Sequence, residues 1–357
     1  MKKWTYQSLS GRQSLIATFV TGALLAGAAM PAAAETTLYV GMNGGTMQKM
    51  YEQYVFPPFE KANNVKIMVI PGTSSDVLAK VRASKENPQM NLMFLDDGLM
   101  YRAIKMGLCT QTHLDQDIDQ QIYKSAHIKG DMATAVSIGL TGIGYNTKMF
   151  KENGWAAPTS WNDLADPKYK GKLIFQSLPS STFGLHAFLM FNRLHNGTED
   201  NVNPGFKAWP DTVGKDVKVY IAGSSKLSEM VQTNEAGIFP ITPTLVSAWK
   251  AKGVDVAYAN PKEGSVTLFY TQCVVNNSKN QELTQKLTNW VLSEKAQALA
   301  LKHAAYIPVN SKVKGTGIEK QELEKSAEYM KTAVTLDWDK INHNRPTWNK
   351  RWNREVE

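Results

Sequence analysis

Three strand–loop–helix units follow one another between residues 36 and 107, and this alternation restricts the fold more than any other feature of the chain. Apolar stretches at 38–42, 65–70 and 91–95 predict strands, and each leads through a polar or glycine-rich loop into a helical pattern. Such alternation is typical of a parallel sheet covered by helices on its faces. The sequence therefore predicts an α/β fold.

Ligands bind such sheets at the carboxyl ends of the strands, and these positions carry small or polar residues here. The candidates in the first half of the chain are Gly44, Gly45, Thr46, Ser74, Ser75, Asp96 and Asp97. The candidates in the second half are Ser180, Ser181, Thr182, Ser224 and Thr242. Tyr145 and Tyr270 are the aromatic residues expected at the site, whereas Tyr39, Phe175, Phe183 and Phe239 are mostly expected in the core.

Two β-branched segments, 132–145 and 266–275, suit strands that cross between two lobes. We therefore expect a first lobe formed by residues 35–142 and 270–310, and a second lobe formed by residues 143–269. The remaining residues, 311–357, should form helices that pack on the first lobe, one of them spanning 318–338. A helix at 47–62 should be interrupted at Pro57 and Pro58, because proline cannot complete the helical hydrogen bonds.

The first 34 residues have the order of a secretory signal peptide. Lys2, Lys3 and Arg12 precede an uncharged apolar stretch at 14–30, and an Ala-x-Ala exit follows at 32–34. Cleavage is predicted after Ala34, and the absence of a cysteine just beyond it favours the periplasm over a lipid anchor. An uncleaved membrane anchor is the alternative. Cleavage removes three positively charged side chains, so the net charge of +8 falls to a small positive charge. This small charge argues against a nucleic-acid partner.

Several motifs occur together in the order found in one family. They are the Trp161–Leu164 and Tyr169–Lys172 segments, the Pro261–Gly264 turn, the Trp290–Ala300 helix, Pro308–Asn310, and the Trp338–Trp352 tail. Over nearly all of the chain after residue 34, the sequence resembles type II periplasmic solute-binding proteins of ABC importers. The resemblance lies in the branch of polyamine, ferric-ion, thiamine and aminoethylphosphonate binders.

The resemblance implies two α/β lobes of mostly parallel sheet, joined by two crossover strands and closing on a solute by hinge motion. It further implies a small-molecule solute, a membrane permease as partner, no cofactor or metal, no enzymatic activity, and a monomer.

The chemistry of the candidates favours a solute with an anionic group. Helix N-termini carry free N–H groups and partial positive charge, which suit a phosphonate, phosphate or carboxylate. Asp96 and Asp97 could hold an amine on the same solute. The alternative interpretation is that the hydroxyl residues are ordinary helix caps, since capping uses the same residue types.

Other ligands and activities remain as alternatives. The adjacent tyrosines of the ferric binders are replaced by Ile241 and Thr242, which argues against iron. Polyamine binders use an acidic residue in the same region, and residues 237–249 contain none, so a polyamine is the second choice. An exported hydrolase on a similar fold is a distant third, because the sequence lacks a G-x-S-x-G and an H-E-x-x-H motif.

Cys109 and Cys273 are the only cysteines, and both belong to the predicted first lobe. An oxidising compartment permits a disulfide between them. The sequence does not report the distance between their Cα atoms, so the bond is left open.

Overall fold

The computed structural model describes residues 36–357, which form one compact unit. The predicted signal peptide and its cleavage site lie outside the described residues. Within the described part of the chain, no helix combines the length and the apolar character needed to cross a membrane.

The first lobe is built on a sheet with the strand order β2-β1-β3-β10-β5. Strands β1 (Thr36–Asn43), β2 (Val65–Gly72) and β3 (Leu92–Asp96) are parallel, as the strand–loop–helix pattern predicts. Strand β10 (Val266–Val274) runs antiparallel to β3 and brings the chain back into this sheet.

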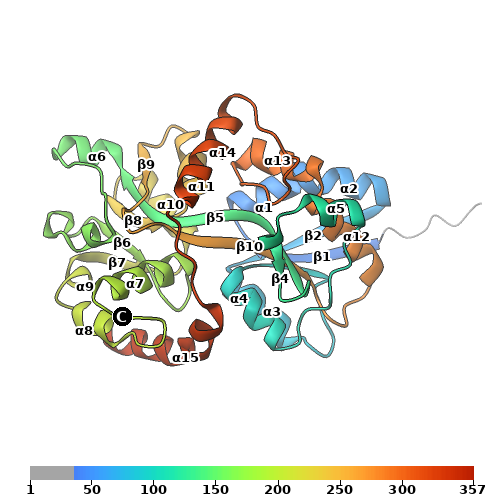
Figure 1. Ribbon diagram of the computed structural model, residues 1–357, viewed down its shortest axis with the longest axis horizontal. Helices are drawn as coiled ribbons and strands as arrows, with labels where there is room; N and C mark the ends of the chain where they lie inside the picture. Colours follow the sequence, from blue (N-terminus) through green and yellow to red (C-terminus); the bar gives the residue numbers. More distant parts are fainter. Residues whose placement is uncertain (1–35) are drawn as a thin grey trace, which may run out of the picture. The chain divides into compact units, whose positions relative to one another are not determined.

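The second lobe is built on β8 (Ile238–Ile241), β6 (Leu173–Gln176) and β7 (Val217–Ile221), which are parallel to one another. The long strand β5 (Ala133–Asn146) belongs to both lobes. Its first part pairs with β10, and its last part pairs with β8 and β9 (Val256–Ala259). Figure 1 shows β5 and β10 running side by side between the two lobes.

Helices cover both faces of each sheet, so each lobe has a core on either side (Figure 1). In the first lobe the helices are α1 (Thr46–Met50), α2 (Phe56–Asn63), α3 (Ser74–Ala83), α4 (Asp97–Lys105), α5 (Gln116–Gln121), α12 (Gln281–Leu292) and α13 (Glu294–Ala304). In the second they are α6 (Thr147–Glu152), α7 (Thr182–Leu194), α8 (Asn203–Ala208), α9 (Val213–Asp216), α10 (Ser224–Gln232) and α11 (Pro243–Lys250).

The helical stretch runs through Pro57 and Pro58 without the predicted interruption. A π-helical turn at Tyr51–Val55 lies between α1 and α2, and the residues on either side of it, Met50 and Phe56, keep the right-handed helical conformation. Within this turn the Phe56 N–H donates to the Tyr51 carbonyl, so the hydrogen-bond pattern changes just before the two prolines in the first turn of α2.

The C-terminal segment differs from the expectation in two ways. The helix predicted at 318–338 is shorter in the structure, because α14 (Gly317–Met330) is followed by a non-helical segment at 331–337 before α15 (Trp338–Glu355) begins. Helix α15 was expected on the first lobe, but its Trp348 and Trp352 lie in the core of the second. The tryptophan rings of α15 pack against aromatic side chains of this core. Trp352, for example, stacks on Phe175 with ring centroids 5.9 Å apart.

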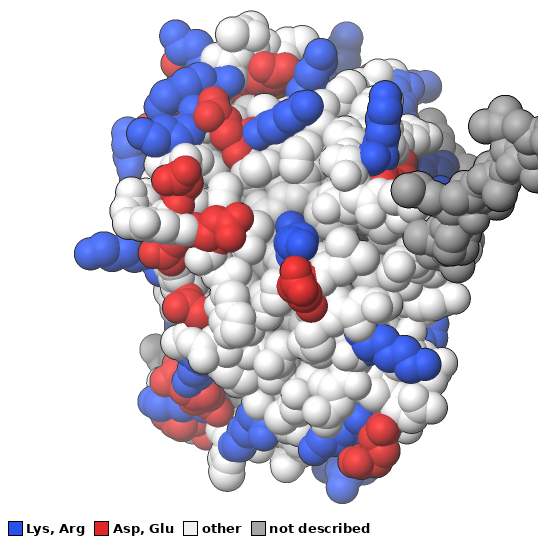
Figure 2. All heavy atoms as spheres, turned by 90° about the vertical axis from the view of Figure 1, so that its right-hand side faces the viewer, with Lys and Arg blue, Asp and Glu red and all other residues white. Residues whose placement is uncertain are grey.

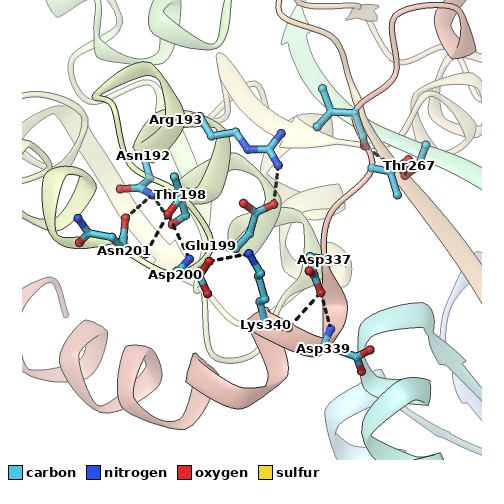
Figure 3. Close-up of polar contacts among 12 residues, drawn as sticks. Asn192, Arg193, Thr198, Glu199, Asp200, Asn201, Thr267, Asp337, Asp339 and Lys340 are labelled. Carbon is cyan, nitrogen blue, oxygen red and sulfur yellow. Dashed lines mark hydrogen bonds and ion pairs between the residues drawn. The ribbon is translucent and has the colours of Figure 1, made fainter.

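Polar contacts hold the start of α15 to a loop of the second lobe (Figure 3). Lys340 forms an ion pair of 2.6 Å with Asp200. The Asn344 side chain also donates to the Glu199 carbonyl. Only the first turns of α15 reach the first lobe, where the Asn342 side chain donates to the Gly98 carbonyl of α4. The helix therefore belongs mainly to the second lobe and touches the first.

A disulfide joins Cys109 to Cys273, with Cα atoms 5.7 Å apart. It ties the segment after α4 to the returning strand β10 and so fixes the discontinuous part of the first lobe.

Candidate functional site

A cavity of about 440 Å³ lies where β5 and β10 pass between the lobes, and both lobes line it. Its size falls within the range of small-molecule pockets. From the first lobe it receives Asn43, Gly44, Thr46, Met47, Pro71, Gly72, Thr73, Ser74, Asp96, Tyr270 and Tyr306. From the second it receives Gln176, Ser180, Ser181, Thr182, Phe183, Ala222, Gly223, Ser224, Ser225, Thr242, Thr244 and Leu245. Ser137, Ile138 and Gly139 of β5 and Leu268 of β10 complete the lining.

Four helices of eight or more residues begin at this cavity with uncharged N-cap residues that line it, and a fifth, α4, begins there with the acidic N-cap Asp96. The uncharged N-cap residues are Thr73 for α3, Ser181 for α7, Gly223 for α10 and Thr242 for α11. The first N–H groups of a helix have no partner within it, so four sets of donors and four positive dipole ends converge on one space.

The interpretation of the hydroxyl residues as ordinary caps holds for α3 and fails for the other three helices. Thr73 caps α3 in a reciprocal capping box with Asp76. In α7, α10 and α11 no N-cap side chain makes a capping hydrogen bond. Ser181 instead donates to the Gln176 side chain at 3.0 Å, which leaves the first turn of α7 without a side-chain cap.

Asp96 connects the two lobes across the cavity. It ends β3, and its Oδ2 accepts a hydrogen bond of 2.5 Å from the Thr182 hydroxyl at the start of α7. Its own N–H donates to the Ser74 hydroxyl. Burial raises the pKa of Asp96, while the hydrogen bonds from Thr182 and Ser74 and the positive charge of Arg345 act in the opposite direction.

Asp97 was predicted at the site, but it does not line the cavity. Its side chain points to the other side of β3, where its two oxygens accept from the N–H groups of Gly98 and Phe269. Burial raises its pKa to about 7. Adjacent residues at a strand end face opposite sides of the sheet, so only one member of this pair can reach the cavity.

Three further candidates lie outside the lining. Gly45 and Ser75 are next to lining residues, at the N-terminal ends of α1 and α3. Tyr145 packs on Phe150 in the second lobe, with ring centroids 4.7 Å apart. The other ten candidates all line the cavity, and their role in ligand binding stays a prediction. They are Gly44, Thr46, Ser74, Asp96, Ser180, Ser181, Thr182, Ser224, Thr242 and Tyr270.

The sequence reasoning missed some polar lining residues. Gln176 ends β6, and the rule of strand ends could have found it. Its Oε1 accepts from Ser181 and, at 3.4 Å, from Ser224. Ser137 lies in the middle of β5, and Tyr306 lies in the loop after α13, where no sequence signal marks a site.

Tyr270 presents a donor to the cavity. Its hydroxyl oxygen accepts a hydrogen bond of 2.9 Å from the Asn43 N–H, so its own hydrogen is left for another partner. Burial raises the pKa of Tyr270, which keeps the hydroxyl protonated at neutral pH.

A cluster of buried polar groups lies near Asp96. His186 of α7 contacts the Thr141 hydroxyl through Nδ1 at 2.8 Å, and burial lowers its pKa to about 3. Arg345 of α15 is buried, and one of its terminal nitrogens donates to the Leu178 carbonyl at 3.4 Å. Burial lowers the pKa of Arg345 to about 10, so its positive charge persists at neutral pH.

The described residues contain no group of three His, Cys, Asp or Glu side chains that could hold a metal ion. Charge on the face seen in Figure 2 is mixed: Lys and Arg are interspersed among Asp and Glu, and one positive and one negative side chain lie together at the middle of the face.

Two α/β lobes with a cavity between them, on which helix N-termini converge, form an architecture typical of proteins that bind a small molecule. A model of the family of bacterial extracellular solute-binding proteins matches residues 55–331. The chain therefore belongs to this family.

Individual relatives agree with this assignment. The chain is 25% identical to the "Putative 2-aminoethylphosphonate-binding periplasmic protein" of Salmonella typhimurium over 305 residues, 80% of this chain and 82% of that protein. The structure of the periplasmic binding protein P5PA matches 90% of this chain and 100% of its own, with a TM-score of 0.77 and 18% identity. AfuA of Actinobacillus pleuropneumoniae, solved with fructose-6-phosphate, matches 90% of this chain and 98% of its own, with a TM-score of 0.73 and 21% identity. These structures share the two-lobe fold.

Proposed function

We propose that this protein captures a small solute with an anionic group, such as a phosphonate, phosphate or carboxylate, in the periplasm and delivers it to the permease of an ABC transporter. The observation that carries the proposal is the convergence of four helix N-termini with uncharged N-cap residues on one cavity, three of them without a side-chain cap. Each such terminus contributes about 0.3–1 kcal/mol when exposed and up to ~2 kcal/mol when partly buried. Four of them can supply much of the roughly 8 kcal/mol that a micromolar affinity requires.

An amino group on the same solute would bind Asp96. Asp96 is the one carboxylate among the lining residues, and it retains lone pairs beyond its bond to Thr182. The Salmonella relative's name agrees with a solute that carries both groups. A diamine such as putrescine would find a partner for only one of its two ammonium groups, which makes a polyamine the weaker candidate.

The test is calorimetry on the purified protein with 2-aminoethylphosphonate, inorganic phosphate, glycerol-3-phosphate and putrescine. Binding of the anions and weak or no binding of putrescine is the expected result. Tight putrescine binding with no response to any anion would overturn the proposal.

The proposed location depends on removal of residues 1–34. N-terminal sequencing of the protein from a periplasmic fraction should read from Glu35. Size-exclusion chromatography with light scattering should give the mass of a monomer. A protein that still begins at Met1 would contradict cleavage and support the alternative of an uncleaved membrane anchor.

A further inference from the structure

Both lobes line the cavity, and the hydrogen bond from the Thr182 hydroxyl to Asp96 joins them on one side. In this arrangement of the lobes the cavity has a volume of about 440 Å³.

The volume of the cavity exceeds what a two-carbon aminophosphonate fills. At ~30 Å³ for each water molecule of the liquid, the cavity of about 440 Å³ has room for roughly fifteen waters. 2-Aminoethylphosphonate has about seven non-hydrogen atoms, each taking no more room than a water at ~30 Å³. About half of the cavity would remain for solvent.

The walls that such a solute would leave uncovered are apolar. Met47 and Leu268 lie on the first-lobe side, Phe183 and Leu245 on the second-lobe side, and Ile138 on the connecting strand. Phe183 follows Thr182 directly in α7, so an apolar ring stands beside the polar groups of the helix terminus. Apolar surface in a cleft favours a ligand that covers it over water in contact with it.

We propose that the solute is larger than 2-aminoethylphosphonate and carries an apolar carbon body, a chain or a ring, attached to its anionic group. This inference rests on the proposed function. The helix N-termini hold the anionic group, and the carbon body displaces water from the wall formed by Met47, Ile138, Phe183, Leu245 and Leu268.

The test is a calorimetric series of 2-aminoethyl-, 3-aminopropyl-, 4-aminobutyl- and 6-aminohexylphosphonate, with 4-aminobenzylphosphonate as the ring-bearing probe. Each added methylene that becomes buried should raise the affinity roughly fourfold. Phe183→Ala should reduce the gain in affinity from 2-aminoethylphosphonate to the longer and ring-bearing probes. Leu194→Ala is the matched control, because Leu194 ends the same helix, is 37% exposed and does not line the cavity.

The two proposals fail in different ways. If neither the phosphonates nor inorganic phosphate and glycerol-3-phosphate bind, the proposed function is wrong. If the phosphonates bind with an affinity that stays flat or falls along the series, the proposed function stands and the apolar carbon body is refuted. A Phe183→Ala variant that weakens all probes equally also refutes the apolar contact.

Discussion

Replacement of Asp96 by asparagine tests whether Asp96 binds an amine of the solute while the helix N-termini bind its anionic group. Asparagine has nearly the same shape and keeps a carbonyl oxygen that can accept from Thr182, so the contact between the lobes survives. The substitution removes only the negative charge. An amine on the solute should therefore lose its partner, while an anionic group held by helix N-termini should be little affected.

The magnitude follows from the kind of bond that is lost. A hydrogen bond to a charged group contributes about 1.5–3 kcal/mol, which corresponds to roughly 10- to 150-fold in affinity. Asp96→Asn should weaken 2-aminoethylphosphonate binding by a factor in that range. It should change the affinity of ethylphosphonate, which lacks the amine, by less than about threefold. Calorimetry on both ligands with both proteins forms a cycle that isolates the contribution of the amine.

Asp97→Asn is the matched control, because the neighbouring carboxylate lies outside the cavity. The pH dependence gives a second readout. Burial raises the pKa of Asp96, so falling pH neutralises it before an ordinary aspartate and should weaken the amine-bearing ligand first. Equal losses for both ligands, or the same losses in Asp97→Asn, would refute the assignment of Asp96 to the amine.

Three further predictions concern stability. Replacing Cys109 and Cys273 together by alanine should lower the free energy of unfolding by about 5 kcal/mol in urea, because the bond closes a loop of 164 residues; an unchanged midpoint would contradict this. Trp352→Ala should cost about 3–5 kcal/mol, since Trp352 is fully buried in the second-lobe core, and a small loss would mean that α15 detaches easily. The raised pKa of Asp97, about 7 against 3.8, gives stability that is present below pH 3.8 and is lost as pH rises through 7. The unfolding free energy of Asp97→Asn minus that of the wild type should therefore be about 3 kcal/mol larger at pH 8 than at pH 5. A difference that does not change with pH would exclude this titration.

The alternation of strands and helices and the two crossings between the lobes could be predicted from sequence because both depend on local patterns. Hydrophobic period, glycine and proline mark where a strand ends, and strand ends are where the cavity forms. Most of the candidate residues therefore line it. The prediction that Asp97 lies at the cavity is wrong because the strand-end rule locates a position along the chain but does not give the direction of each side chain.

Contacts between distant segments could not be predicted in this way. The sequence left the pairing of Cys109 with Cys273 open, because a separation of 164 residues says nothing about distance in space. Likewise, α15 carries tryptophans that could cover either lobe. Its packing on the second lobe depends on rings such as Phe175, whose position is set by the fold.

Three hydroxyl groups of the cavity act as hydrogen-bond acceptors toward a solute, although residue type alone suggests that they could donate. A hydroxyl has one hydrogen to donate. Ser180 donates it to the Ala222 carbonyl, Ser181 to the Gln176 side chain, and Thr182 to Asp96. In this arrangement all three can only accept from a solute, so they oppose an anion and favour a hydroxyl or an amine. The donors left for the proposed anionic group are the backbone N–H groups at the helix termini and the Tyr270 hydroxyl, because the cavity has no lining lysine or arginine.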